Sequence, residues 1–287
     1  MLRALITVML VLATSASPEQ AKVKPAASKT PDRPFASDYQ PSPDFDEQAE
    51  QRLLEMANQS RAEAGAPPLA FDDGLIQAAR AHAAAMAREQ QLAHQLNGEP
   101  SLPHRLADAS VLHLDHAGEN VALDITADLA HAHLMLSPPH RENLLDGSYN
   151  VAGFGVIRRE GRMYVVEDFG HSLPAYTPQQ TENAIAEAIN RTRRAAHLPA
   201  LMRASSEALR PAVCTMAQQD RLGTSSMREL GQRYSVVSYT NKHPEVLPAS
   251  AAKIIGNRGI RSMAVGACYA RTDTYPSGVY WVGLALY

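Results

Sequence analysis

The chain is poor in cysteine and nearly balanced in charge, and both features limit what it can be. Its 287 residues contain two cysteines, Cys214 and Cys268, too few for the disulfide framework of a small secreted scaffold. The pair could still form one disulfide bond, and the sequence leaves both states open. The net charge of −3 provides no strongly basic surface for nucleic acid or an anionic membrane.

Long apolar runs are also scarce. The one clear example lies near the N-terminus, where ALITVMLVLA follows Arg3 and precedes the small residues Thr14–Ala16. This pattern predicts a signal peptide over residues 1–16, and its apolar part is too short to span a bilayer comfortably. We therefore expect an exported protein, secreted or periplasmic, with no transmembrane segment in the mature chain. A retained N-terminal anchor is the alternative.

Two common catalytic signatures are absent from the sequence. Without H-E-x-x-H the chain is not expected to be a zincin, and without G-x-S-x-G it lacks the nucleophile elbow of an α/β-hydrolase. A triad of Ser137, His140 and Glu119 is disfavoured, because the Ser137 hydroxyl is expected to cap a helix.

What the sequence does contain is a regular succession of elements. Residues 17–45, rich in Pro, Ser, Ala and Lys, predict a disordered linker. Apolar spacing and cap residues then predict helices over about 46–65, 72–94 and 126–136, and a β-hairpin over 149–171. His82 lies on the apolar stripe of the second helix, which favours a core histidine. His131 and His133 diverge on the third helix, so we expect no shared metal there.

The second half of the chain echoes the first. NQSRAEAGAPPL (58–69) aligns without gaps with NRTRRAAHLPAL (190–201), and AVGACYARTDTYPSGVYWVGLAL echoes the first hairpin. We interpret the chain as two related modules, the first over 46–172 and the second over 180–287. A chance likeness between two helix-plus-hairpin stretches is the alternative. The second half has no G-E-N and no S-P-x-H-R, so a site built on these motifs would be lost there.

The motifs of the first module occur in a specific order. N-x-x-R leads to a helix ending in His94, then to G-E-N (118–120), S-P-x-H-R-x-N (137–143) and G-x-G-V (153–156). This succession resembles the bacterial branch of the CAP superfamily, whose SCP domain occurs in cysteine-rich secretory proteins, antigen 5 and plant pathogenesis-related 1. The resemblance covers about residues 48–171. It implies an α+β fold, a three-layer α-β-α sandwich, with a degenerate second copy.

The resemblance also implies a ligand cleft. By motif, His94 and His140 take the two histidine positions that commonly bind a divalent metal, and Glu119 takes the first acidic position. Ser137 falls where many members carry a second acid. Glu167, where bacterial relatives often have Gln, is a further candidate for the cleft.

The chemistry of these residues supports a site. A helix starting at Pro138 or Pro139 and capped by Ser137 places His140 near a positive helix end, which favours the neutral imidazole that binds metal. Two histidines, a carboxylate and an open position suit Zn²⁺ or another divalent cation. In the alternative, His140 only starts a helix and Glu119 only pairs with Arg141.

These features predict an extracytoplasmic binding protein rather than an enzyme. Its ligand would be a small molecule, a lipid or a component of the cell envelope, with a divalent metal as a candidate cofactor. One alternative is a metal-assisted hydrolase with Glu119 as general base. Another is a structural interaction module of the cell envelope that uses the fold only as a scaffold.

Overall fold

The computed structural model describes residues 45–223, 227 and 235–287. The predicted signal peptide and all of the predicted linker except Phe45 lie outside these residues. In the part of the chain that is described, no helix is both long and apolar enough to cross a membrane.

The first module is built largely from local signals that the sequence displays. The side chain of Asp46 caps the first helix by accepting from the Ala49 N–H, and Gly65 ends it in the left-handed conformation at φ 77°. Asp72 caps the second helix in the same way. In chain order the elements are α1 (Glu47–Ala64), β1 (Ala70–Phe71), α2 (Asp73–Glu89), α3 (Leu102–Ala109), β2 (His113–Asp124), α4 (Ala127–Leu136), α5 (Pro138–Leu145), β3 (Val151–Arg159) and β4 (Arg162–Leu173).

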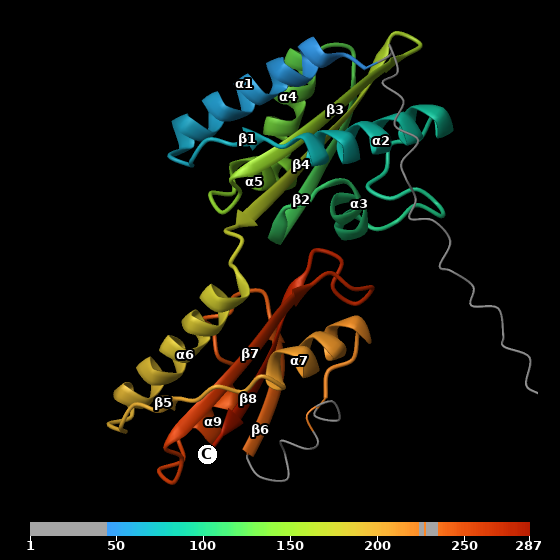
Figure 1. Cartoon of the computed structure of the whole chain (residues 1–287). Coiled ribbons are helices and arrows are strands. Elements are labelled where there is room, and N and C mark those ends of the chain that lie inside the picture. The colour runs from blue at the N-terminus through green and yellow to red at the C-terminus, as the bar shows by residue number, and fades with distance from the viewer. Residues whose placement is uncertain (1–44, 224–226, 228–234) are drawn as a thin grey trace, which may run out of the picture. The chain divides into compact units, whose positions relative to one another are not determined.

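These elements form the expected α-β-α sandwich (Figure 1). The sheet has the order β1-β3-β4-β2, with β1 parallel to β3 and the other pairs antiparallel. One apolar cluster joins α1, α4 and α5 to one face, and another joins α2 to the opposite face. The G-x-G-V motif allows the second contact, because a Cβ on Gly153 or Gly155 would meet the α2 backbone at 2.0 or 2.3 Å.

Besides the two-residue strand β1, two elements of this module were not predicted from the sequence. The 12-residue strand β2 carries the G-E-N motif but shows no simple alternation, because its residues 119–122 are all buried. Helices cover both faces of the sheet, and a strand buried on both sides loses the period-two pattern. The short helix α3 is the other element, and it supplies a residue of the site.

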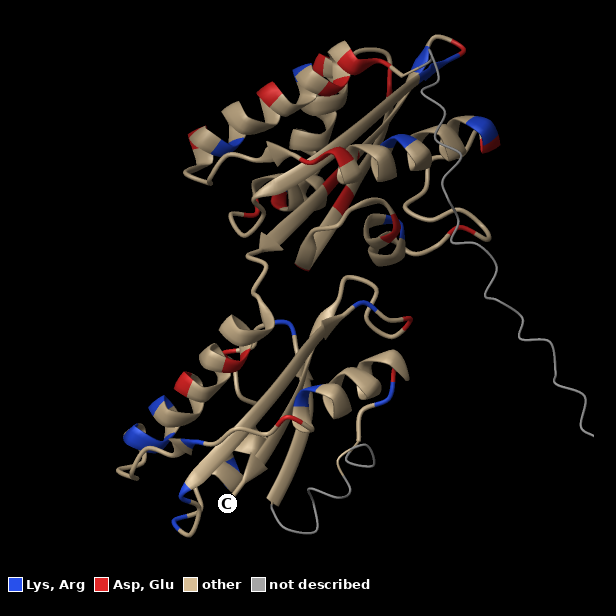
Figure 2. Cartoon of the chain, viewed as in Figure 1, with Lys and Arg blue, Asp and Glu red and all other residues tan. Residues whose placement is uncertain are grey.

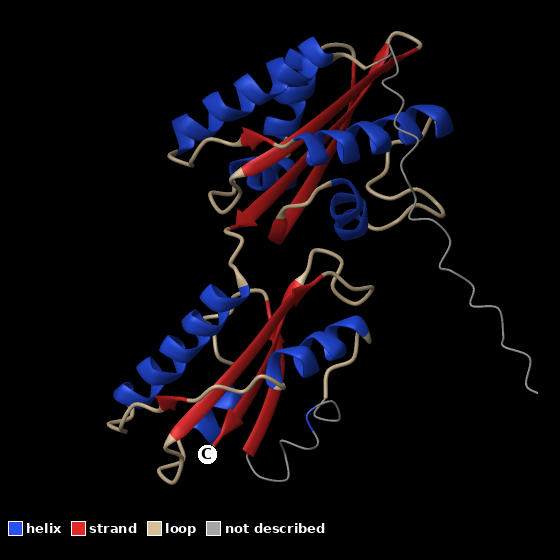
Figure 3. Ribbon diagram, in the orientation of Figure 1, coloured by secondary structure: helices blue, strands red, loops and turns tan. Residues whose placement is uncertain are grey.

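The second module contains a sheet of the same design (Figure 3). Its strand order is β5-β7-β8-β6, again with the short first strand parallel to its neighbour and the others antiparallel. The described elements are α6 (Pro178–Ala195), β5 (Met202–Arg203), α7 (Leu209–Gln218), β6 (Ser235–Asn241), α9 (Ala249–Ile255), β7 (Ser262–Ala270) and β8 (Val279–Leu286).

Side-chain contacts repeat between the modules as well. The Asn58 amide bonds both the N–H and the C=O of Leu69, and the Asn190 amide does the same with Leu201. These contacts give Asn58 and Asn190 a structural role. Three further features match between the modules. They are the ion pairs Glu50–Arg80 and Glu182–Arg210, the bonds of Arg61 and Arg193 to backbone carbonyls, and the left-handed backbone of Gly65 and His197. The repeated contacts support the interpretation of two related modules.

The two cysteines, whose state the sequence left open, form a disulfide bond. Their Cα atoms are 5.2 Å apart, and the bond connects α7 to β7. Trp281 and Tyr280 on β8 are buried, as expected for the core of a hairpin.

Candidate functional site

His94 and His140 come from opposite layers of the first module and meet beside β2. His94 lies in the loop after α2, whereas His140 lies in α5 on the other face of the sheet. Because β2 is an edge strand, side chains from the two layers can approach each other at its free side. The centroids of the two imidazole rings are 6.4 Å apart.

Each ring is oriented through its Nδ1 atom. His94 Nδ1 lies 2.9 Å from Glu119 Oε1, and His140 Nδ1 lies 2.9 Å from Ser137 Oγ. No partner is found for the Nε2 atom of either ring among the described residues. We call His94, Glu119, Ser137 and His140 the histidine site.

The role of Ser137 differs from the expectation. It precedes α5 at the N-cap position, but its side chain makes no capping hydrogen bond. Its hydroxyl bonds the His140 ring instead, so Ser137 positions an imidazole. Glu119 contacts His94 and has no hydrogen bond or ion pair with His140 in the described structure, which argues against the serine triad.

Arg105 of α3 is the partner of Glu119, and it was not predicted from the sequence. Its Nη2 donates to Glu119 Oε2, while its Nη1 lies 3.4 Å from Glu99 Oε2 and donates to the His94 carbonyl at 3.2 Å. Both oxygens of Glu119 are therefore engaged. The expected alternative, a pair between Glu119 and Arg141, is not the arrangement that forms.

Asp168 completes an acidic cluster around Arg105, which we define as Glu99, Glu119 and Asp168. Asp168 is fully buried, and neither of its carboxylate oxygens has a hydrogen-bond partner in the described structure. Burial raises its pKa well above the usual value, the charge of Glu119 raises it further, and Arg105 opposes both. One guanidinium thus stabilises several carboxylates, and one of them is favoured in its neutral form.

His82 is a core histidine, as expected. It is fully buried, with Nδ1 at 2.7 Å from Glu99 Oε1 and Nε2 at 2.9 Å from the Ala93 carbonyl. These bonds fix the chain just before His94. His131 and His133 have separate partners, Ser60 and Asp124, and do not share a site.

Glu167 is fully buried and is connected to His140 through Asn120. Its Oε2 accepts from Asn120 Nδ2 at 3.2 Å, and the same amide nitrogen donates to the His140 carbonyl at 3.1 Å. The resemblance suggested that Glu167 faces the ligand cleft. In the structure its carboxylate is buried instead, and it supports α5 through Asn120. Burial raises the pKa of Glu167 to about 7, while the Asn120 hydrogen bond acts in the opposite direction.

We expect Glu167→Gln to stabilise the protein at pH 8 and to leave its stability unchanged at pH 4.5. The raised pKa favours folding below the unfolded-state value of 4.5, and this contribution is lost as pH rises to about 7. The shift corresponds to about 3 kcal/mol. Urea unfolding at both pH values measures the difference, with exposed Glu63→Gln as control. An equal change in stability at both pH values would contradict the raised pKa of Glu167.

The pKa of His140 is lowered, so its imidazole is favoured in the neutral form. The largest cause is burial, followed by repulsion from His94. The direction agrees with the expectation from the sequence, but the main cause is burial rather than the helix start.

The site meets some requirements of a metal centre and lacks others. Two imidazoles with oriented Nδ1 atoms and free Nε2 atoms suit a divalent cation. A metal held tetrahedrally by both rings would bring their centroids to roughly 5 Å, so a small movement is needed. Within residues 45–223, 227 and 235–287, no group of three or more His, Cys, Asp or Glu side chains is arranged to hold a metal ion. Two protein ligands fit, and further ones would have to come from solvent or a ligand.

The second module lacks the equivalent site. Gly155 and Gly266 each lie against the backbone of a helix, so we treat them as equivalent positions in the two sheets. The strand registers then give the equivalent residues on the other strands. Strands β6, β7 and β8 contain no acidic or basic residue, whereas β2 and β4 do (Figure 2). The positions of Glu119, Asn120, Glu167 and Asp168 are occupied by Val236, Val237, Leu284 and Ala285.

The fold and the order of motifs define the first module as a CAP-type domain. Residues 54–169 match the family model for CAP, the cysteine-rich secretory protein family. The chain therefore contains a CAP domain. None of the curated proteins compared with the chain matches it.

Solved structures of similar fold include two bacterial proteins. One is an extracellular protein containing an SCP domain from Bacillus anthracis, with 24% identity and a TM-score of 0.40 over 44% of this chain and 41% of that chain. The present chain thus spans less than half of that protein. The other is an outer surface protein from Borrelia burgdorferi, with 19% identity and a TM-score of 0.41 over 44% of this chain and 94% of that chain. Na-ASP-1 matches over 85% of this chain and 90% of its own, with 6% identity and a TM-score of 0.48.

Proposed function

We propose that this chain is an exported binding protein whose CAP domain binds a small-molecule, lipid or cell-envelope ligand at the histidine site, together with a divalent cation such as Zn²⁺. The observation that carries the proposal is the approach of the two rings to 6.4 Å, each oriented at Nδ1 and free at Nε2. Side chains from opposite layers that serve only packing would have no need for this arrangement.

Each residue of the site then has a defined role. His94 and His140 bind the cation through Nε2, while Glu119 and Ser137 fix the orientation of the rings. Arg105 provides the counter-charge for the buried Glu119 carboxylate. When bound, the cation supplies a positive charge for a carbonyl or anionic group of the ligand.

The engagement of Glu119 favours binding over hydrolysis. A general base needs an oxygen that is free to accept a proton from water. Glu119 uses one oxygen for His94 and the other for Arg105, and it is largely buried. We therefore propose that Glu119 orients the His94 ring and does not act as a general base.

Two features support export. The N-terminal sequence has the charged, apolar and small-residue segments of a signal peptide, and the described chain contains a disulfide bond. Disulfide bonds persist mainly in oxidising compartments.

Zinc is expected to raise the thermal midpoint of unfolding at pH 7.5, because it binds only the folded site. At about 100 times the dissociation constant, the stabilisation is roughly 2.7 kcal/mol. His94→Ala and His140→Ala should each abolish the shift. The matched control is His133→Ala, which removes an exposed histidine bonded to Asp124 and should retain the shift.

The same titration at pH 5 should give a much smaller shift, because protons compete with the metal for imidazole nitrogen. A zinc effect that survives the double variant His94→Ala/His140→Ala would refute the metal site. No zinc effect in the unaltered protein would favour the structural role of the fold.

A further inference from the structure

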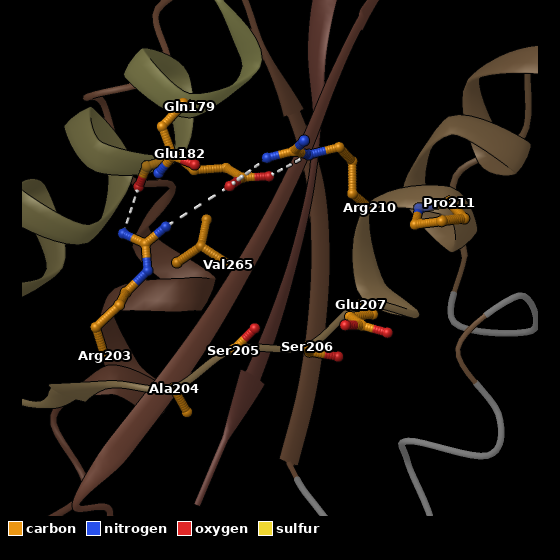
Figure 4. Close-up of a pocket in the computed structure, with 10 residues that line it drawn as sticks. All are labelled: Gln179, Glu182, Arg203, Ala204, Ser205, Ser206, Glu207, Arg210, Pro211 and Val265. Atoms are coloured by element: carbon orange, nitrogen blue, oxygen red, sulfur yellow. Dashed lines mark hydrogen bonds and ion pairs between the residues drawn. The ribbon is translucent and has the colours of Figure 1, made fainter.

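The second module contains a cavity of about 610 Å³ at the edge of β7 (Figure 4). Strand β5 covers this edge over only two residues, and the cavity lies where β5 ends. Its walls come from α6, β5, the segment leading to α7 and the start of α7, with Val265 of β7 between them. The volume falls within the range of about 300–1,000 Å³ of small-molecule sites.

Two aromatic rings fill the corresponding place in the first module. Phe71 and Arg203 are each the second residue of the short parallel strand, paired with Ala152 and Met263. Two positions further along the neighbouring strand lie Phe154 and Val265. Phe71 and Phe154 pack edge to face with centroids 5.5 Å apart. A guanidinium and an isopropyl group replace them in the second module, and this exchange contributes to the open space.

The late start of α7 enlarges the cavity. Helix α2 begins at Asp73, directly after its cap, whereas α7 begins only at Leu209. The intervening Ser205 and Ser206 line the cavity (Figure 4).

The positive charge at one end of the cavity exceeds the negative charge that faces it. Arg210 binds Glu182 in a bidentate pair at 2.7 and 2.8 Å. Arg203 donates to the Glu182 carbonyl at 3.0 Å and lies 3.7 Å from its carboxylate. One buried carboxylate thus faces two guanidinium groups. Arg203 Nε and Arg210 Nη1 have no partner among the described residues, so donors remain for a ligand.

Burial lowers the pKa of Arg203, and the charge of Glu182 acts against this shift. An anion next to Arg203 would compensate for the lost solvation of its guanidinium. Glu207 is the second acidic residue of the lining and lies next to Ser206, away from Arg203 (Figure 4). It disfavours ligands with negative charge at both ends.

We propose that this cavity is a second ligand site, which binds a small molecule through one carboxylate or phosphate group held by Arg203, Arg210 and Ser205. Arginine donors suit the planar carboxylate and the phosphate oxygens alike. The site is independent of the histidine site and exists only where the aromatic pair of the first module is absent.

Isothermal titration of the metal-free, full-length chain at low ionic strength tests the proposal with inorganic phosphate and with acetate as separate probes. At least one anion is expected to bind with a stoichiometry of one. Arg203→Ala should weaken binding at least about tenfold, because a charge-assisted hydrogen bond is lost. The matched control is Arg191→Ala, which removes an exposed arginine of α6 and should leave the affinity unchanged.

Restoring the aromatic pair gives a second, opposite test. Arg203→Phe combined with Val265→Phe should fill the cavity and abolish binding, while Trp281 fluorescence confirms that the second module remains folded. Arg203→Gln provides the smaller change if the double variant does not fold. The double variant His94→Ala/His140→Ala should bind the anion normally. Binding of phosphate alone indicates a phosphorylated ligand, and binding of acetate indicates a carboxylate. Binding of neither anion, or binding that survives loss of Arg203, would overturn the proposal.

Discussion

Replacing Arg61 with methionine is expected to lower the free energy of unfolding of the first module by about 4 kcal/mol. The Arg61 side chain is fully buried and donates only to backbone carbonyls. The acceptors are those of Pro67 at 2.8 Å, Leu144 at 2.7 Å, Asp146 at 2.9 Å and Tyr149 at 3.0 Å. Methionine preserves much of the apolar stem, so the loss reports the hydrogen bonds and the carbonyls left without partners.

The same substitution at Arg193 is expected to destabilise the second module similarly. Arg193 donates to the carbonyls of Pro199, Ile255, Asn257 and Ile260, which repeats the pattern of Arg61. Trp281 is the only tryptophan and lies in the second module, so its fluorescence in urea reports the effect there. Circular dichroism reports the first module as well.

The matched control for Arg61 is Arg52→Met on the same helix. The Arg52 side chain is 50% exposed and pairs with Asp128 at the surface. Surface pairs contribute little, so a change within about 0.5 kcal/mol is expected. A loss at Arg61 no larger than the loss at Arg52 would show that the buried carbonyls find other partners.

Replacing Arg105 with leucine should cost about 3–5 kcal/mol at pH 7.5, because it leaves buried carboxylates without a counter-charge. Glu99 and Glu119 would lose their ion pairs, and Asp168 would lose the charge that opposes its raised pKa. The His94 carbonyl would also lose a donor, so the histidine site should bind zinc less well.

The cost of Arg105→Leu should shrink as pH falls below the ordinary glutamate pKa of about 4.3, since protonated carboxyls need no counter-charge. Urea unfolding at pH 7.5 and pH 4 measures the trend. Arg105→Lys keeps the positive charge, so it should lower the free energy of unfolding less than Arg105→Leu does. Adding Glu119→Gln to Arg105→Leu should recover part of the lost stability. A loss that is independent of pH would indicate packing rather than electrostatics.

The sequence determined the features whose cause lies within a few residues. Asp46, Gly65 and Asp72 cap their helices, and each cap needs only a side chain or a left-handed glycine and the adjacent turn. The β-hairpin predicted over 149–171 is also present, and its turn residues Glu160 and Gly161 both have positive φ. The order of motifs then indicated the fold through its resemblance to the CAP family, and residues 54–169 match the model of that family.

The strand β2 and the partners of the histidine site required the tertiary structure. A strand covered by helices on both faces carries no alternating pattern, so its assignment depends on elements that are distant in sequence. Arg105 could not be linked to Glu119 without the position of α3. The Ser137 hydroxyl had two possible partners nearby, and only the placement of the His140 ring decided between a cap and a ring contact.

The cavity of the second module depended even more on tertiary structure. The sequence showed that the second module lacks the histidine motifs, but it contained no signal for a different site. Glu182, Arg203, Arg210 and Val265 come from four elements of the fold. Their meeting follows from the replacement of two aromatic rings and from the late start of a helix. A cavity is the volume that packed elements fail to fill, so no local pattern of residues encodes it.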